Sequence, residues 1–76
     1  MKDVLELVIK SLVDNKDEVV IEEKQENKSI CYEVKVSKDD MGKVIGKQGK
    51  MAKAIRTVIR AIATKENKKV SIEFLD

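Results

Sequence analysis

All three glycines of this 76-residue chain lie within the eight residues 42–49, and the chain contains no proline. Stretches with helical spacing of apolar residues lie on both sides of this segment. Gly46 lies where a short helix is expected to end, a place that favours a left-handed residue. Gly49 lies where the next helix is expected to begin, which leaves the free N–H groups of that helix pointing outward. The sequence therefore predicts a tight loop whose side chains are those of Lys47 and Gln48. Such a loop lets a nucleic-acid backbone approach main-chain amides, although an ordinary helix–turn–helix connector would carry the same glycines.

The first half of the chain predicts one helix and two strands. Residues 3–13 carry apolar side chains at i, i+4 spacing, which is typical of an amphipathic helix. After a polar turn at 14–17, a short strand begins around residues 19–21. Residues 30–36 alternate between apolar and polar side chains, the clearest strand pattern in the chain. The turn at 26–28 between these strands is short, so we expect an antiparallel hairpin.

The second half predicts two helices and a last strand. Ser37 and Asp40 have the spacing of a capping box at the start of a short helix that runs to about Ile45. A longer helical pattern covers residues 50–64, and residues 70–74 alternate into a strand after a polar turn. Strands joined by a helical crossover pair in parallel. We therefore predict an α+β fold of order α-β-β-α-α-β, with a three-stranded mixed sheet and the helices packed on one face.

Composition limits the chemistry that the chain can perform. No linker, repeat or low-complexity tract divides it, so residues 1–76 are expected to form one domain. With no histidine and a single cysteine, it has no internal disulfide and almost no ligands for zinc. A nucleophile would lack its usual base, so we expect no enzyme, metal or cofactor, and we interpret Cys31 as a strand residue. The longest apolar run is three residues, so we expect no membrane segment and a cytoplasmic location.

Basic residues are concentrated in one segment. Residues 43–60 contain no acidic residue and six basic ones, Lys43, Lys47, Lys50, Lys53, Arg56 and Arg60. The rest of the chain has 10 basic and 14 acidic residues. This asymmetry is expected of a site for a polyanion, and a solvated helix face is the alternative. The glycine spacing fits neither the P-loop nor the dinucleotide fingerprint, in which Val44 would have to be glycine.

Residues 44–55, Val-Ile-Gly-Lys-Gln-Gly-Lys-Met-Ala-Lys-Ala-Ile, resemble the I-G-x-x-G-x-x-I signature of K-homology (KH) RNA-binding domains. The predicted element order resembles the type II arrangement of that domain, and the whole chain is similar to the bacterial KhpA family. The chain departs from the signature after the loop, where Met51 or Ala52 takes the aliphatic position. Its aromatic residues are Tyr32 and Phe74 alone, which argues against base stacking and agrees with a KH groove that clamps about four nucleotides.

The resemblance implies a function and a set of site residues. Single-stranded RNA would bind with its backbone on the loop residues Gly46, Lys47, Gln48 and Gly49. The nearby Lys43, Lys50 and Lys53 would add positive charge, and Ile45 would provide an aliphatic wall. The family is implied to act as an RNA chaperone or post-transcriptional regulator. It is implied to pair with itself and with a KhpB/Jag partner in the control of cell elongation and envelope growth.

The helix over residues 50–64 carries more apolar surface than one sheet can bury. At 100° per residue its apolar arc spans roughly 200°, about twice what such burial requires. We place the core face at Met51, Ile55, Val58 and Ile62. We then predict a homodimer interface at the side chains beyond it, Ala52, Arg56, Ile59 and Ala63. A single broad core face with alanine as filler is the alternative. The second candidate function is a dimerising protein–protein adaptor with a KH fold and secondary RNA contact.

Overall fold

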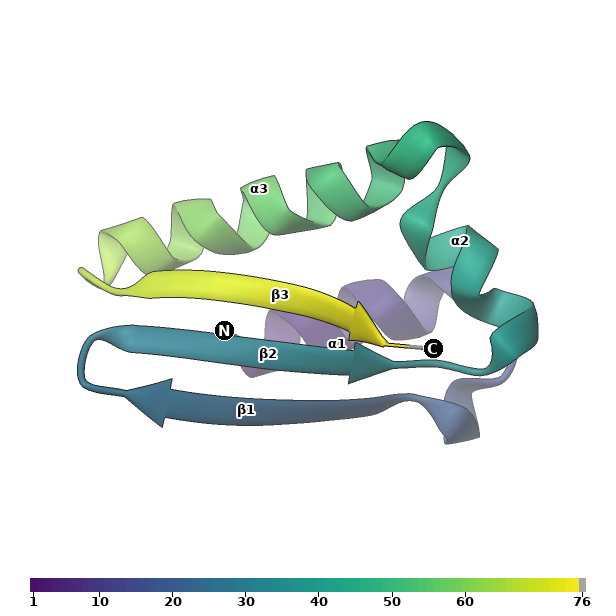
Figure 1. Cartoon of the computed structure of the whole chain (residues 1–76), viewed down its shortest axis with the longest axis horizontal. Coiled ribbons are helices and arrows are strands. Elements are labelled where there is room, and N and C mark those ends of the chain that lie inside the picture. Colours follow the sequence, from purple (N-terminus) through teal and green to yellow (C-terminus); the bar gives the residue numbers. More distant parts are fainter. Residues whose placement is uncertain (76) are drawn as a thin grey trace.

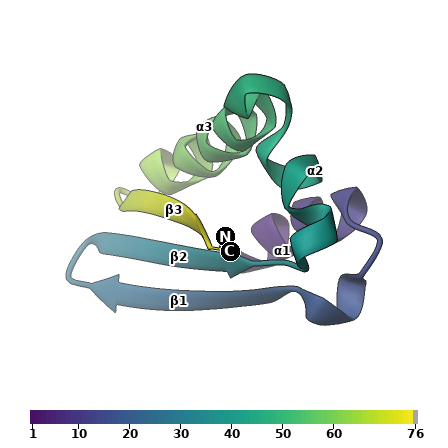
Figure 2. The ribbon, with the colours of Figure 1, turned by 45° about the vertical axis from the view of Figure 1, so that its right-hand side comes forward.

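The computed structural model describes residues 1–75, which form a β-sheet and a layer of helices against one of its faces (Figure 1). A view turned by 45° shows the labelled helices on the same side of the sheet (Figure 2). The elements of this part of the chain are α1 (Lys2–Leu12), β1 (Val20–Glu26), β2 (Ser29–Lys35), α2 (Met41–Ile45), α3 (Lys50–Lys65) and β3 (Lys69–Leu75), with short 3-10 turns over Lys16–Glu18, Lys38–Asp40 and Lys47–Gly49. This order and the one-sided packing of the helices confirm the predicted fold.

The strands lie in the order β1-β2-β3, so β2 is central. β1 runs antiparallel to β2 through a hairpin that turns at Asn27, whose φ of 50° is one that asparagine tolerates. β2 is parallel to β3, with Ile30 opposite Val70, because the crossover through α2 and α3 returns the chain to the same end of the sheet. The mixed sheet is therefore confirmed. β1 continues to Glu26, beyond the apolar residues 19–21, because an edge strand can carry exposed charged side chains.

The core lies between the sheet and the helices. Alternate residues of β2 point into it, which is why the apolar positions of this strand recur with a period of two. The buried apolar residues of the core cluster are Leu5, Ile9, Val13, Ile30, Tyr32, Val34, Val36, Val44, Ile55, Ile59 and Ile72. Burial raises the pKa of Tyr32, because the phenolate loses its hydration, and the Tyr32 hydroxyl stays protonated.

Asp40 joins the start of α2 to the loop that follows α1. Its side chain is 1% exposed and accepts hydrogen bonds from the backbone N–H groups of Asp14 (3.2 Å) and Asn15 (2.9 Å). The Asn15 amide and the Ser37 hydroxyl also donate to it, at 3.1 Å each. These bonds favour the carboxylate, chiefly that from the Asn15 backbone, and hold the pKa of Asp40 well below its usual range.

The predicted capping box is therefore wrong. The Ser37 side chain makes no capping bond to the backbone of the described turn, Lys38–Asp40, that precedes α2. Its hydroxyl donates to the Asp40 carboxylate, which faces residues 14 and 15. Spacing along the chain cannot reveal this arrangement, because the N–H groups that Asp40 binds lie 25 and 26 positions earlier.

Candidate nucleic-acid interface

The loop at residues 46–49, which we call the GxxG loop, is shaped by two glycines. Gly46 ends α2 with φ 77° and ψ 176°, a conformation confined essentially to glycine. A Cβ added there would lie 2.5 Å from the Met51 Cβ, so the backbone of Gly46 packs directly against α3. Gly49 is left-handed (φ 74°, ψ 11°) and caps α3. The positive φ expected at Gly46 is confirmed, although its ψ lies outside the left-handed helical region, and Gly49 adopts a left-handed conformation that the sequence did not predict.

The GxxG loop presents both side chains and backbone to solvent. Lys47 and Gln48 are exposed, and Gln48 is itself left-handed, with φ 57°. Among residues 1–75 no side chain caps the N-terminus of α3. The first-turn N–H groups of a helix lack partners within it, and the helix dipole adds positive potential there. The loop therefore combines amide donors, a lysine and a helix N-terminus, an arrangement that can bind a phosphate.

The orientation of α3 differs from the one predicted from its sequence. Ala52, Ile59 and Ala63 are buried against the sheet, and Ile59 is 0% exposed. Val58, placed in the core by the sequence, is 49% exposed, and Met51 is also exposed. The dimer interface predicted at Ala52, Ile59 and Ala63 is therefore wrong, because these side chains fill the core.

Arg56 shows which side of α3 faces β3. Its Nε donates a hydrogen bond to the carbonyl oxygen of Ile72 at 3.2 Å, and its guanidinium lies 5.3 Å from the centre of the Phe74 ring. A cation over an aromatic face is attracted by the ring electrons. Arg56 therefore belongs to the flank of α3 beside β3 and not to the predicted dimer seam.

Basic side chains follow one another from the GxxG loop along this flank of α3. At 100° per residue, Lys53, Arg56 and Arg60 lie about 60–120° around α3 from Ile59, on the β3 side. We call these residues the basic flank. Lys47, Lys50, Lys53 and Arg60 are exposed, and none of them takes part in an ion pair within residues 1–75. Their charges are therefore available to a polyanion.

Lys43 has a different environment from the other predicted binding residues. Its ammonium group pairs with the carboxylates of Asp14 and Asp40, and the hydrogen bond with Asp14 raises the pKa of Lys43. Ile45 is half-buried against the core at the end of α2. The structure thus brings together the GxxG loop, Lys50 and Lys53, whereas the Lys43 ammonium is paired with the carboxylates of Asp14 and Asp40.

The other flank of α3 is apolar. A groove between α1 and α3 is lined by Val8, Met51, Ala54, Ile55, Val58 and Ile59. Its exposed members on α3 lie about 80–140° from Ile59, on the side opposite the basic flank. Val4, 37% exposed, continues the apolar surface one turn along α1. The sequence did not predict this groove. The feature that could have indicated it is the wide apolar arc of the helix over residues 50–64, which exceeds what one sheet can bury.

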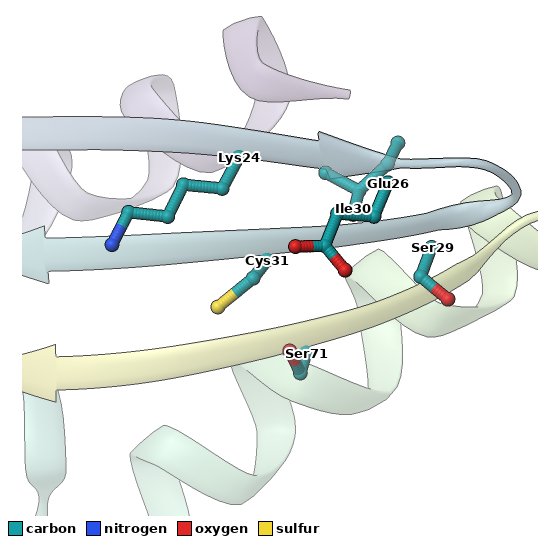
Figure 3. Close-up of a pocket in the computed structure, with 6 residues that line it drawn as sticks. All are labelled: Lys24, Glu26, Ser29, Ile30, Cys31 and Ser71. Atoms are coloured by element: carbon teal, nitrogen blue, oxygen red, sulfur yellow. The ribbon is translucent and has the colours of Figure 1, made fainter.

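The face of the sheet away from the helices carries a shallow pocket. It is lined by Lys24, Glu26, Ser29, Ile30, Cys31 and Ser71, and Figure 3 shows side chains from neighbouring strands gathered there. Lys24 pairs with Glu33 on this face at 3.0 Å. Within residues 1–75 no three carboxylate or cysteine side chains are grouped to hold a metal ion. None of the helices described there has the length and apolar composition needed to cross a membrane.

The comparisons with known proteins agree with one another. The family model described as "KhpA/KhpB, KH domain" matches residues 2–74. RNA-binding protein KhpA of Clostridium acetobutylicum is 59% identical over 75 residues, covering 99% of this chain and all of the relative. The KhpA protein of Clostridium perfringens is 56% identical with the same coverage, and that of Chlamydia trachomatis is 45% identical over 76 residues, 97% of its length. No solved structure matches the chain.

Proposed function

Because the chain belongs to the KhpA/KhpB family of KH domains, we propose that it binds single-stranded RNA by clamping the sugar–phosphate backbone on the GxxG loop. One observation carries the proposal. Gly46 packs against Met51 and Gly49 caps α3, so exposed Lys47 and Gln48 lie directly beside a helix N-terminus. The relatives named RNA-binding proteins support the choice of RNA as the polyanion.

Each part of the site has a distinct role in this proposal. The amides of the GxxG loop and the ammonium of Lys47 bind phosphate oxygens. Lys50 and Lys53 add charge along the strand without reading its sequence. The half-buried Ile45 offers an apolar wall to a base. A KH domain holds about four nucleotides in this way and needs no aromatic platform. Lys43 is not part of the proposed site, since Asp14 and Asp40 bind its ammonium.

The test reverses the charge of the GxxG loop. Lys47→Asp with Gln48→Asp should abolish binding of a four-nucleotide RNA, because two carboxylates would face the phosphates. A matched control exists in the β1–β2 hairpin, where Asn27→Asp with Lys28→Asp makes the same charge change. Asn27 has a positive φ of 50°, similar to the 57° of Gln48, so both variants place one aspartate in this conformation. Circular dichroism should show both variants folded. Equal RNA affinity of the loop variant and the control would overturn the clamp.

We propose self-association as a second property, carried by the apolar groove between α1 and α3. A twofold axis would lay Val58 and Met51 of one copy against the same groove of another, which closes the assembly as a dimer. The basic flank faces away from this groove, so a dimer would leave the basic flank of each copy open. Val58→Asp should give a folded monomer by analytical ultracentrifugation. Val20→Asp, at a valine of nearly equal exposure (48%) on the other face of the sheet, should leave the dimer intact.

The cellular part of the proposal rests on the family. We propose that the domain acts as an RNA chaperone or post-transcriptional regulator, together with a KhpB/Jag-like partner, in cell elongation and envelope growth. The family model that spans KhpA and KhpB supports a shared type of domain in the two proteins. Acceleration of annealing of complementary RNA strands by the wild type, and not by the loop variant, tests the chaperone role. The same rate with both proteins would contradict it.

A further inference from the structure

A second cationic hollow lies at the opposite end of α3 from the GxxG loop. It is lined by Arg60, Thr64, Lys68, Lys69 and Val70, which come from α3, the turn after it and the start of β3. None of the described residues in this lining carries a carboxylate. Within residues 1–75 no ion pair involves Arg60, Lys68 or Lys69. We call this surface the distal hollow.

The backbone of the distal hollow is fixed by hydrogen bonds. The N–H of Lys68 donates to the carbonyl oxygen of Ala63 at 2.9 Å, and the N–H of Lys69 donates to that of Lys28 at the same distance. Lys68 and Val70 are half-buried. The backbone positions of Lys68 and Lys69 are therefore fixed, unlike those of lysines on a free loop. The apolar side chain of Val70 lies beside them.

The distal hollow continues the basic flank. Lys53 and Arg60 lie on the same side of α3 and are separated by about 10 Å along its axis, at 1.5 Å per residue. Cations therefore follow one another from the GxxG loop to the far end of the helix over about 20 Å. Compensation of the helix dipole explains a lysine in the last turn, a place that Lys65 already holds. It does not explain three cations around a hollow with an apolar floor.

We propose that the distal hollow is a second phosphate-binding subsite, which holds the backbone of a single-stranded RNA longer than the four nucleotides that the clamp covers. This inference rests on the proposed RNA-binding function and deepens it. The strand leaves the GxxG loop, follows the basic flank and binds through its phosphates to Arg60, Lys68 and Lys69. The Thr64 methyl group and Val70 contact the apolar part of the ribose or base. The domain then prefers longer strands without reading their sequence in this region.

The experiment compares two RNA lengths. A triple variant, Arg60→Gln, Lys68→Gln and Lys69→Gln, is measured with four- and ten-nucleotide oligouridylates by fluorescence anisotropy. The matched control neutralises three exposed lysines away from the distal hollow, Lys2→Gln, Lys35→Gln and Lys38→Gln. Longer RNA offers more binding registers to every protein equally, so the ratio of variant to wild-type affinity is taken at each length.

The distal hollow predicts a length-dependent loss. The triple variant should bind the four-nucleotide RNA within about twofold of the wild type and the ten-nucleotide RNA about tenfold more weakly. Its salt slope on the longer RNA should be shallower by about 1.4–2, since each single-strand phosphate contact contributes about 0.7. Equal losses at both lengths, or an equal loss in the control, would overturn the subsite and leave the clamp standing. Binding of the longer RNA that survives Lys47→Asp with Gln48→Asp but not the triple variant would overturn the clamp alone. No binding of either RNA by the wild type would overturn both.

Discussion

Replacement of Gly46 by alanine should destabilise the domain far more than the same change at Gly49. A Cβ at Gly46 would lie 2.5 Å from the Met51 Cβ and 2.8 Å from the Met51 backbone nitrogen. Neither atom can rotate away, because both are fixed by the first turn of α3. At Gly49 the φ of 74° is also strained for alanine, but an added Cβ meets no heavy atom of the described residues within 4 Å.

The expected magnitudes follow from these geometries. Gly49→Ala should cost about 1–2 kcal/mol, the penalty of an L residue in the left-handed region. Gly46→Ala adds a backbone clash to conformational strain of about 1–3 kcal/mol, so we expect a total of about 3–5 kcal/mol. A domain of this size has roughly 4–11 kcal/mol of stability, so this variant should approach unfolding. Gly42→Ala, within α2 and in open space, should instead stabilise by about 0.5–1 kcal/mol.

Urea denaturation followed by circular dichroism at 222 nm measures the three variants against the wild type. The expected order of midpoints is Gly42→Ala highest, then wild type, Gly49→Ala and Gly46→Ala. The slope of free energy against urea should stay constant, because the surface exposed on unfolding does not change. Coincident midpoints for Gly46→Ala and Gly49→Ala would refute the packing of Gly46 against Met51.

Three further predictions concern the fold and the RNA site. Asp40→Asn should lower the urea midpoint, because the amide NH2 replaces one of the two carboxylate oxygens and cannot accept the backbone hydrogen bond, from residue 14 or 15, that this oxygen received. Because the hydrogen bonds from residues 14 and 15 lower the pKa of Asp40, their stabilisation of the wild type should be complete above about pH 4 and should be lost as the pH drops further. The urea midpoint of Asp40→Asn should therefore fall less than that of the wild type over the same pH range. Ile59→Ala should cost about 2–4 kcal/mol in thermal unfolding at low protein concentration and Val58→Ala less than about 1 kcal/mol; equal losses would contradict the orientation of α3. The logarithm of RNA affinity, measured by anisotropy, should fall with the logarithm of salt with a slope of roughly −2 to −3, and a flat response would mean that the basic flank is only solvated.

The element order and the parallel pairing were predictable because local patterns determine them. The alternation over residues 30–36 survives as the buried side of β2, and Gly46 adopts the expected positive φ. The crossover between β2 and β3 leaves little choice of strand direction. These features depend on neighbouring residues and on general rules of chain connection.

The rotation of α3 and the partners of charged side chains were not predictable. α3 is apolar on both sides of Ile59, so periodicity alone does not choose between Val58 and Ile59 for the core. The contact between Arg56 and the Ile72 carbonyl, which joins different elements, shows the orientation. Lys43 likewise looked like any other lysine of the basic segment, because its partner Asp14 lies 29 positions earlier in the chain.

The parallel pairing of β2 with β3 also fixes an order of events in folding. The β1–β2 hairpin is local and can form within microseconds, but Val70 reaches Ile30 only after the intervening helices have closed a long loop. Until then β2 presents an unpaired edge and its inward apolar row, Ile30, Tyr32 and Val34, to any strand nearby. During synthesis that edge exists from the time β2 emerges until β3 does. The interval in which this domain is most exposed to misassociation is therefore set by the translation time of residues 36–75.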